Sequence, residues 1–273
     1  MQATLGPKTQ LRVLVAEDNP LNQLLATRLI EKLGHFVQVV SDGQLALNLL
    51  LEQTFDVVLM DLRMPVMDGL DAVRELRRRE LTIGQHLPVI GISANTMDHD
   101  REQCVAVGMD EFVGKPLREA ELAAALSRVF RKSREACPVT IVGDDQEAKL
   151  TDSCNLAVAS TRLAGDESFL QQLIQLFLET VPQQIESLSA AMIPLNRNVI
   201  SDAAHSIKGT IRYFAADPAY NAALQLEIIS RSGATTDVHQ SYDRLMNEIQ
   251  RLRTDLQNTR LPLNELVTNS GVF

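Results

Sequence analysis

Residues 56–69 read DVVLMDLRMPVMDG, in which the apolar run at 57–60 is followed directly by the acid Asp61. A short run of β-branched and other apolar residues is typical of a buried strand, and we expect this strand to cover Asp56–Met60. Asp61 then stands directly at the carboxyl end of the strand. The amphipathic stretch that follows predicts a helix over 69–80.

The same alternation of strand and helix extends to both sides of this stretch. Similar apolar runs predict strands at Arg12–Ala16, Val37–Val40, Val89–Ile92 and Phe112–Val113. Amphipathic stretches between them predict helices over about 20–33, 43–53, 97–107 and 118–131. Because the alternation repeats five times within residues 11–130, we expect a parallel sheet with helices on both faces.

The second half of the chain has a different pattern. Residues 132–152 show no sustained periodicity and are predicted to be a linker. Residues 169–188 repeat apolar side chains three and four apart, which predicts a helix with Asp166 as its N-cap. Further helices are predicted over about 197–214, 217–231 and 236–258. The chain therefore divides into domains at 9–131 and 153–260, the second a helical bundle, with a loose tail at 261–273.

The composition restricts the classes of function. The 273 residues are 45% hydrophobic and 22% charged, which suits folded cores rather than disorder. A net charge of −9 argues against nucleic-acid binding, and the basic run at 74–79 is interpreted as a solvated helix face. Three cysteines without Cys-x-x-Cys spacing fit a reducing compartment. With no signal peptide and no apolar run long enough to span a bilayer, we expect a cytoplasmic protein without membrane contacts.

Polar side chains follow four of the predicted strands where each strand ends. They are Glu17, Asp18, Asp61, Ser93 and Lys115, and Pro116 follows the lysine. Ligands of open parallel sheets bind at this edge, so we expect these residues to converge. Three crowded carboxylates need a compensating cation, and their hard oxygen atoms favour Mg²⁺. The lysine and the serine could neutralise the oxygens of a phosphoryl group, and an aspartate can accept that group as a nucleophile.

Each of these residues alone has a more ordinary interpretation. An acidic pair after a strand is commonly a helix N-cap, and a Lys-Pro dipeptide is commonly a turn. Their joint placement at successive strand ends favours a shared site.

Residues 11–130 resemble the receiver domain of two-component response regulators and hybrid sensor kinases. The matching segments are Val13–Asn19, Leu59–Gly69, Ile92–Asn95 and Gly114–Pro116. The resemblance implies a flavodoxin-like α/β fold, a doubly wound parallel sheet of five strands in the order 2-1-3-4-5. It also implies that Asp61 is phosphorylated.

The same resemblance implies a metal site. Mg²⁺ would be held by Asp18, Asp61 and the backbone carbonyl of Arg63, with Glu17 helping through a water molecule.

The resemblance further implies residues that respond to the phosphoryl group. Ser93 and Phe112 would be the switch pair, and Phe112 stands where many members carry Tyr, so the switch lacks a hydroxyl group. Lys115 would bind the phosphoryl group, and the Lys115–Pro116 peptide bond would be cis.

His205 is the candidate phosphoacceptor of the second half. Helical spacing places it on one face with Lys208, Gly209 and Arg212. The opposite stripe is apolar and is formed by Ile200, Ala204, Ile207, Ile211 and Phe214. We therefore expect an exposed histidine beside two cations, which would lower its pKa and bind phosphoryl oxygens. A glycine inside a helix costs about 1 kcal/mol relative to Ala, which suggests that another surface approaches here. An idle surface histidine is the alternative.

Residues 155–258 resemble a histidine phosphotransfer domain. The matching segments are Leu163–Glu167, Ser201–Phe214, Leu226–Glu227 and Arg231–Gly233. The resemblance implies a four-helix bundle in which His205 is the phosphoacceptor, with supporting roles for Lys208, Gly209 and Arg212.

Together these observations predict a phosphorelay protein. A histidine kinase would phosphorylate Asp61, and the group would pass to His205, or another chain's aspartate would supply His205. A downstream response regulator receiver is the expected second partner. The chain shows no ATP-binding signature, so we expect a phosphotransfer protein without small-molecule turnover. It would be either a free-standing relay protein or the C-terminal part of a hybrid sensor kinase.

Two other classes of function remain as alternatives. A Mg²⁺-dependent phosphohydrolase with an aspartate nucleophile typically carries a second acid two residues later, and that position is Arg63 here. An interaction scaffold with an inactive receiver is disfavoured because Asp18, Asp61 and Lys115 are all present.

Overall fold

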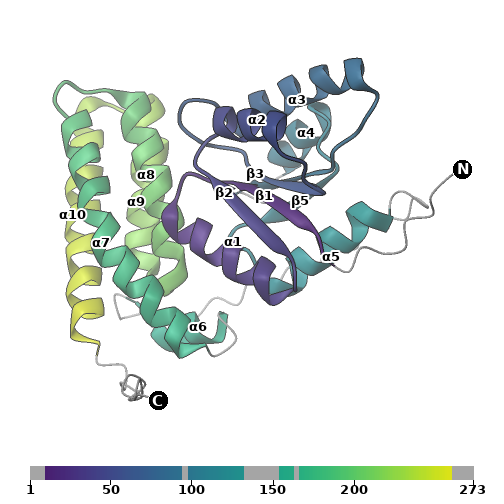
Figure 1. Cartoon of the computed structure of the whole chain (residues 1–273). Coiled ribbons are helices and arrows are strands. Elements are labelled where there is room, and N and C mark those ends of the chain that lie inside the picture. The colour runs from purple at the N-terminus through teal and green to yellow at the C-terminus, as the bar shows by residue number, and fades with distance from the viewer. Residues whose placement is uncertain (1–9, 94–97, 132–153, 163–165, 260–273) are drawn as a thin grey trace, which may run out of the picture. The chain divides into compact units, whose positions relative to one another are not determined.

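The structure, a computed structural model, describes residues 10–93, 98–131, 154–162 and 166–259. The chain divides into two compact units, one from each half of the sequence. In Figure 1 the first unit contains strands and helices, whereas the second contains helices alone. The predicted linker 132–152 and the predicted tail 261–273 lie outside the described residues.

The first unit is built on a parallel sheet whose strand order is β2-β1-β3-β4-β5. The strands are β1 (Arg12–Ala16), β2 (Phe36–Val40), β3 (Val57–Asp61), β4 (Val89–Ser93) and β5 (Glu111–Gly114). Every neighbouring pair is parallel, so the predicted doubly wound sheet is confirmed. All five residues of β3 and of β4 are buried, which explains their continuous apolar runs.

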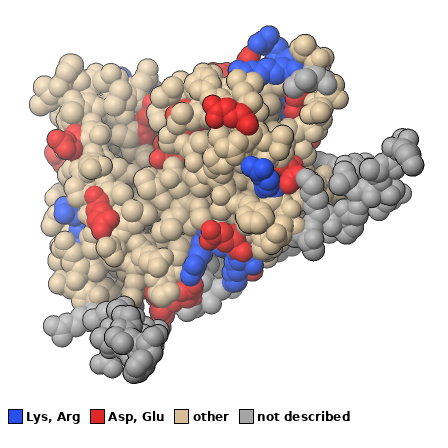
Figure 2. Space-filling model, viewed as in Figure 1, with Lys and Arg blue, Asp and Glu red and all other residues tan. Residues whose placement is uncertain are grey.

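Helices cover both faces of this sheet, with α1 and α5 on one side and the other three on the opposite side (Figure 1). They are α1 (Pro20–Lys32), α2 (Gly43–Glu52), α3 (Gly69–Ile83), α4 (Asp98–Ala106) and α5 (Glu119–Arg131). The arginines of α3 pair with acids on the same helix, including Arg78 and Arg79 with Glu75 at 2.7 and 2.8 Å. Figure 2 accordingly shows blue and red side chains together over α3, as expected of a solvated helix face.

The second unit is a bundle of long helices. Its elements are α6 (Leu156–Arg162), α7 (Glu167–Ala191), α8 (Arg197–Ile211), the 3₁₀ turn η1 (Arg212–Phe214), α9 (Asp217–Ser232) and α10 (Thr235–Asn258). Helix α8 packs against α7 and α9, and α10 packs against the same two helices, which confirms the four-helix bundle. The short helix α6 was not predicted. Within the described residues, no helix combines the length and the apolar character required to cross a membrane.

The predicted apolar stripe of α8 lies in the core of this bundle. All of its members are fully buried; they are Ile200, Ala204, Ile207, Ile211 and Phe214. The ring of Phe214 meets that of Phe177 edge to face, with centroids 5.0 Å apart. Asp166 caps α7 as predicted, because its side chain accepts a hydrogen bond from the backbone N–H of Phe169 at 3.0 Å. The buried stripe fixes which face of α8 points away from the core.

Candidate functional sites

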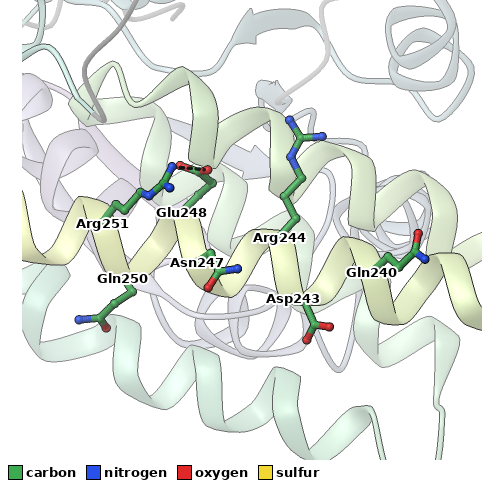
Figure 3. Close-up of a pocket in the computed structure, with 7 residues that line it drawn as sticks. All are labelled: Gln240, Asp243, Arg244, Asn247, Glu248, Gln250 and Arg251. Carbon is green, nitrogen blue, oxygen red and sulfur yellow. Dashed lines mark hydrogen bonds and ion pairs between the residues drawn. The ribbon is translucent and has the colours of Figure 1, made fainter.

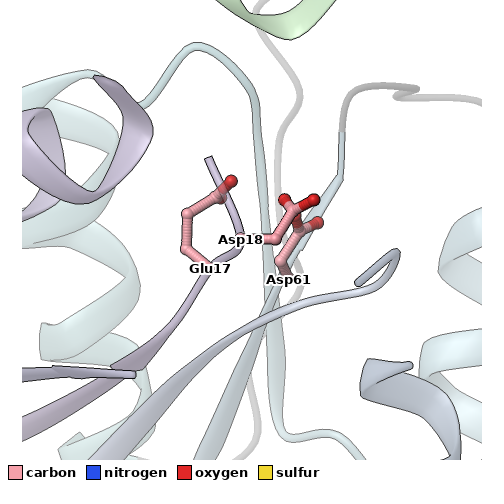
Figure 4. Close-up of side chains that lie close together, drawn as sticks. All are labelled: Glu17, Asp18 and Asp61. Atoms are coloured by element: carbon pink, nitrogen blue, oxygen red, sulfur yellow. The ribbon is translucent and has the colours of Figure 1, made fainter. Parts of the chain in front are cut away.

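Three carboxylates meet at the carboxyl edge of the sheet in the first unit. Ala16 pairs with Met60 across β1 and β3, so the residues after Ala16 lie level with Asp61. One oxygen from each of Glu17, Asp18 and Asp61 lies within 4.8 Å of the other two. Figure 4 shows the carboxylates of Asp18 and Asp61 close together, with Glu17 beside them. The predicted convergence of the acids is therefore present.

Lys115 supplies the positive charge of this cluster. Its Nζ atom lies 2.7 Å from Oδ2 of Asp61 and 2.7 Å from Oε2 of Glu17. The lysine side chain is 9% exposed, so these ion pairs are largely shielded from water. The backbone N–H of Lys115 also donates to the carbonyl of Ser93 at 2.7 Å, which ties the end of β5 to the end of β4. The Lys115–Pro116 peptide bond is cis, as the family resemblance implies.

The electrostatics of the cluster show an excess of negative charge. Burial and the neighbouring Glu17 raise the pKa of Asp61 to about 8 and that of Asp18 to about 7. Burial alone would lower the pKa of Lys115, but the charges of Asp61 and Glu17 outweigh it and raise that pKa. One lysine therefore compensates the three carboxylates only in part. Closely spaced hard oxygen donors with uncompensated charge suit a divalent cation such as Mg²⁺.

Glu17 is held in place from the first turn of α1. Its Oε1 accepts a hydrogen bond from Nδ2 of Asn22 at 2.7 Å and another from the backbone N–H of Asn19 at 3.2 Å. Asn19 is the N-cap of α1, because its own side chain accepts from the backbone N–H groups of that turn. The ordinary interpretation of Glu17-Asp18 as the helix cap is therefore wrong. Neither acid is the N-cap of α1, and both belong to the acidic cluster.

Gly69 allows the chain to fold back against the phosphoacceptor candidate. A Cβ atom at this position would lie 2.0 Å from the carbonyl oxygen of Asp61, so no other residue fits without a backbone shift. The N–H of Gly69 donates to the carbonyl of Leu62 at 3.0 Å, which closes the loop between β3 and α3. Within that loop the N–H of Arg63 lies 3.4 Å from Oδ1 of Asp61, while the Arg63 side chain is exposed.

The proposed switch residues lie on β4 and β5. Ser93 ends β4, is 5% exposed and pairs in register with Gly114. Phe112 is partly buried and packs against the apolar core between the sheet and the helices α2 to α4. Ser93 thus lies at the carboxyl edge of the sheet, where the three acids lie, whereas Phe112 packs against the core.

The second site lies between α8 and α9 of the bundle. Nδ1 of His205 lies 2.9 Å from Oε1 of Glu227, and Nζ of Lys208 lies 2.6 Å from Oε2 of the same carboxylate. Arg231 approaches Glu227 at 3.6 Å and donates from Nε to the hydroxyl of Ser201 at 3.0 Å. Glu227 therefore binds both the histidine and the lysine.

The charge state of Glu227 determines the tautomer of His205. Burial would raise the pKa of Glu227, but the hydrogen bonds and charges of His205 and Lys208 lower it to about 2. The carboxylate is then ionised at neutral pH and only accepts hydrogen bonds. Nδ1 of a neutral His205 must carry the proton that it donates, which leaves the lone pair on Nε2.

The surroundings of His205 differ from those predicted. The side chain is 18% exposed rather than open, and Lys208 is buried at 6% exposure and paired with Glu227. Arg212 lies past the end of α8, with its guanidinium 5.8 Å from the ring centre of Tyr220. The prediction of an exposed histidine beside two cations was wrong, because helical spacing within α8 does not reveal Glu227, the partner of His205 and Lys208 on α9. Gly209 is half-buried and follows Lys208.

The family resemblance includes Glu227 but implies no role for its side chain. A signal for it exists in the sequence. It lies on α9 between Leu226, which is fully buried, and Ile228, which is 52% exposed. An acid at the border of an apolar face is seldom buried unless it is paired, so a cationic or histidine partner could have been sought on α8.

A pocket found on the bundle lies away from these residues. It is lined by α10 side chains; they are Gln240, Asp243, Arg244, Asn247, Glu248, Gln250 and Arg251. Figure 3 shows them along one helix, where Arg251 pairs with Glu248 at 3.1 Å. Neither candidate phosphoacceptor lines this pocket.

Comparison with known proteins finds a family match for each half of the chain. The family model of the response regulator receiver domain matches residues 13–127, and the model of the Hpt domain matches residues 172–255. The first range contains the acidic cluster with Lys115, and the second contains His205 and Glu227.

Curated relatives include two bacterial sensor kinases. The sensor histidine kinase GacS of Pseudomonas protegens is 27% identical over 228 residues, which cover 78% of this chain and 23% of that protein. The signal transduction histidine-protein kinase BarA of Escherichia coli K12 is 26% identical over 239 residues, which cover 85% of this chain and 26% of that protein. The chain thus spans about a quarter of the length of these relatives.

A solved structure also matches the first half of the chain. It is the receiver domain of the sensor histidine kinase PA1611 from Pseudomonas aeruginosa, crystallised with a magnesium ion coordinated in its active site cleft. That domain is 39% identical, covers 44% of this chain and 96% of its own, and gives a TM-score of 0.40.

Proposed function

Because the chain is a response regulator receiver domain followed by an Hpt domain, as in the C-terminal parts of hybrid sensor kinases, we propose that it relays phosphoryl groups through Asp61 and His205. In the proposed route Asp61 accepts the group from the phosphohistidine of a histidine kinase. The group then passes to His205, and from there to an aspartate of a downstream receiver. The proposed domains are residues 9–131 and 153–260.

The observation that carries this proposal is the position of Lys115 between two acids. Its ammonium lies 2.7 Å from Asp61 and 2.7 Å from Glu17, in a cluster where Asp61 is 2% exposed. A buried aspartate beside a buried lysine and further acids is suited to form an acyl phosphate.

The transfer to Asp61 is a single displacement at phosphorus. A carboxylate oxygen of Asp61 forms a bond to the phosphorus atom while the phosphorus–nitrogen bond of the donor histidine breaks. The electron pair of the broken bond stays on the imidazole nitrogen, which the donor protein or water protonates. Lys115 and the hydroxyl of Ser93 would neutralise the phosphoryl oxygens, and the pair of Ser93 and Phe112 would respond to the new group.

The acidic cluster is the proposed site of Mg²⁺. Its residues fit this ion because the three carboxylates offer oxygen atoms within 4.8 Å of one another. Asp18, Asp61 and the backbone carbonyl of Arg63 would hold it, with Glu17 acting through water. When bound, Mg²⁺ would supply positive charge that orients the phosphoryl oxygens.

His205 is proposed as the second acceptor through its Nε2 atom. The hydrogen bond between Nδ1 and Glu227 at 2.9 Å fixes the ring and its tautomer, so that the lone pair of Nε2 attacks the phosphorus of the acyl phosphate. The phosphorus–oxygen bond to the aspartate then breaks and its electron pair returns to the carboxylate. Lys208 supports this arrangement by holding the other oxygen of Glu227 at 2.6 Å. Gly209 and Arg212, which follow on the same predicted face, are proposed to support the transfer.

Labelling with acetyl phosphate and Mg²⁺ tests both acceptors. Acyl phosphates are labile in alkali, whereas phosphohistidine is stable in alkali and labile in acid, so the two products can be counted separately. We expect wild type to carry both, His205→Ala to keep only the alkali-labile product, and Asp61→Ala to carry neither. The exposed acid Asp71 provides the control Asp71→Asn, which should behave as wild type.

Two results would contradict the proposal. If the wild-type chain is not labelled by acetyl phosphate and Mg²⁺, Asp61 is not a phosphoacceptor. An alkali-stable label that survives in His205→Ala would remove His205 from the relay.

A further inference from the structure

The carboxylate of Glu17 has a partner on each of its two oxygen atoms. Oε2 lies 2.7 Å from the ammonium of Lys115, and Oε1 accepts from Nδ2 of Asn22 at 2.7 Å and from the N–H of Asn19 at 3.2 Å. Glu17 is 2% exposed and Asn22 is 5% exposed, so these bonds are shielded from water and strengthened by burial. The side chain of Glu17 therefore cannot turn without breaking at least one of them.

Asn22 is a polar residue on the buried face of α1. The other buried residues of this helix are apolar, and they are Leu21, Leu25, Ala26 and Ile30. A buried amide costs free energy unless it is hydrogen-bonded, and an apolar residue of similar size would satisfy the packing of α1. The amide at this position is therefore explained by its hydrogen bond to Glu17 rather than by packing.

A chain of short contacts leads from Asn22 to the phosphoacceptor candidate. It passes through Glu17 to Lys115, and the ammonium of Lys115 lies 2.7 Å from Oδ2 of Asp61. In the proposed transfer an oxygen of Asp61 bonds to phosphorus, so that the carboxyl group loses its charge and attracts Lys115 less strongly. Glu17 is then the acid that keeps the ammonium beside the phosphoryl oxygens, and it can do so only from a fixed position.

We propose that Asn22 is a positioning residue for phosphoryl transfer at Asp61. Its hydrogen bond fixes Glu17, and Glu17 in turn fixes the ammonium of Lys115. The inference rests on the proposed function and adds a residue of α1 to it. A hydrogen bond to a charged group corresponds to roughly a 10- to 100-fold change in a rate or an equilibrium, so removal of the amide should be measurable.

Acetyl phosphate labelling of two alanine variants of the full chain tests this role. Both carry His205→Ala, so that the label stays on Asp61, and alanine suits the helix at either position. We expect the second-order rate constant for labelling, with Mg²⁺ present, to fall about tenfold or more in Asn22→Ala. Gln23→Ala is the matched control, because the Gln23 amide donates to the backbone carbonyl of Glu17 at 2.6 Å rather than to its carboxylate. That control should keep the rate constant of its parent.

The same change in a chain that lacks the Glu17 carboxylate separates positioning from a general effect on folding. If Asn22 acts through Glu17, then Glu17→Ala alone should lose at least as much as Asn22→Ala. Adding Asn22→Ala to Glu17→Ala should then change the rate constant by less than about twofold. A purely structural effect of Asn22 would instead lower the rate constant by the same factor with or without Glu17.

Acylation of lysines by acetic anhydride follows the setting of Lys115 without any phosphorylation. The side chain of Lys115 is 9% exposed, whereas that of Lys32 is 55% exposed and serves as the internal reference. Peptide mass spectrometry should show acylation of Lys115 relative to Lys32 rising severalfold in Asn22→Ala and staying unchanged in Gln23→Ala. This pattern, together with the loss of labelling that depends on Glu17, supports the inference.

Four results would overturn it. Asn22→Ala could be labelled at the rate of its parent, it could lose the same factor with and without Glu17, Gln23→Ala could lose as much, or acylation of Lys115 could stay unchanged in Asn22→Ala. All four differ from failure of the proposed function, in which acetyl phosphate leaves Asp61 of the wild-type chain unlabelled.

Discussion

Nδ1 of His205 lies 2.9 Å from a carboxylate oxygen of Glu227 on the neighbouring helix. The same carboxylate holds the buried ammonium of Lys208, so one acid binds both the imidazole ring and the lysine. Glu227 therefore links the reactivity of the histidine to the stability of the bundle, and its replacement should affect both.

Replacing Glu227 with Gln should weaken the bundle and slow phosphorylation of His205. The amide cannot neutralise Lys208, which is 6% exposed, and breaking such a buried pair costs about 3 kcal/mol or more. It also no longer requires the proton to stay on Nδ1, so we expect formation of the alkali-stable label to slow about tenfold or more. Thermal melting followed by circular dichroism and labelling through Asp61 measure the two effects.

The double variant Glu227→Gln with Lys208→Met separates them. It removes both charges of the pair, so most of the lost stability should return while phosphorylation of His205 stays slow. Recovery of labelling together with stability would show that Glu227 acts only on folding and not on the histidine.

The stability that Glu227 provides should depend on pH in the acidic range. Its pKa is lowered from 4.5 to about 2 in the folded chain, so its stabilisation is fully present above about pH 4.5 and is lost as the pH falls through 2. The shift corresponds to about 3 kcal/mol. Urea unfolding of wild type and Glu227→Gln at pH 6, 4 and 2 should show a difference in unfolding free energy that shrinks with acid. A constant difference across this range would contradict the assignment.

Mg²⁺ should stabilise the receiver domain through the acidic cluster. Occupancy at 100 times the dissociation constant adds about 2.7 kcal/mol to the unfolding free energy, which is visible as a rise in melting temperature. We expect Asp18→Asn to lose this response, because Asp18 is one of three acids whose oxygens lie within 4.8 Å of each other. Asp71→Asn, which changes an acid paired with Arg74 on the exposed face of α3, should retain it.

Gly69→Ala should disturb Asp61 from outside the acidic cluster. The added Cβ would lie 2.0 Å from the Asp61 carbonyl oxygen and 2.9 Å from the Met60 side chain, so β3 or the start of α3 must move. We expect both a lower melting temperature and a loss of acetyl phosphate labelling. Gly84→Ala serves as the control, because its Cβ meets nothing within 4 Å and only the positive φ of 65° opposes it, at about 1 kcal/mol. That control should label normally.

Much of the first site follows from the sequence because its residues are tied to strand ends. Apolar runs locate β1, β3, β4 and β5, and parallel order then brings Asp61 and Lys115 to one edge, 54 residues apart in the chain. The backbone at Val66, which has a positive φ of 67°, does not follow in this way. Left-handed backbone is normally signalled by Gly or Asn, and a valine gives no such signal.

The second site was predicted less completely, because it depends on contacts between helices. Helical spacing assigns a face to His205 and Lys208, but it does not say which side chain of α9 meets that face. The ion pair at 2.6 Å between Lys208 and Glu227 joins residues 19 positions apart, across a turn whose geometry no local pattern encodes. The short helix α6 was missed for a similar reason, since its seven residues are too few to show a clear period.

The acids at the sheet edge and the lysine that pairs with two of them come from the ends of β1, β3 and β5. No short segment of this chain contains the receiver site, and a proteolytic fragment that lacks any of these strands would lack part of the charge balance around Asp61. Incorporation of phosphate from a small donor therefore reports the assembly of the whole sheet. In a denaturant series the fraction of chains phosphorylated on Asp61 should fall in the same transition as the folded fraction of the receiver domain. Phosphorylation of Asp61 therefore also measures folding of this domain.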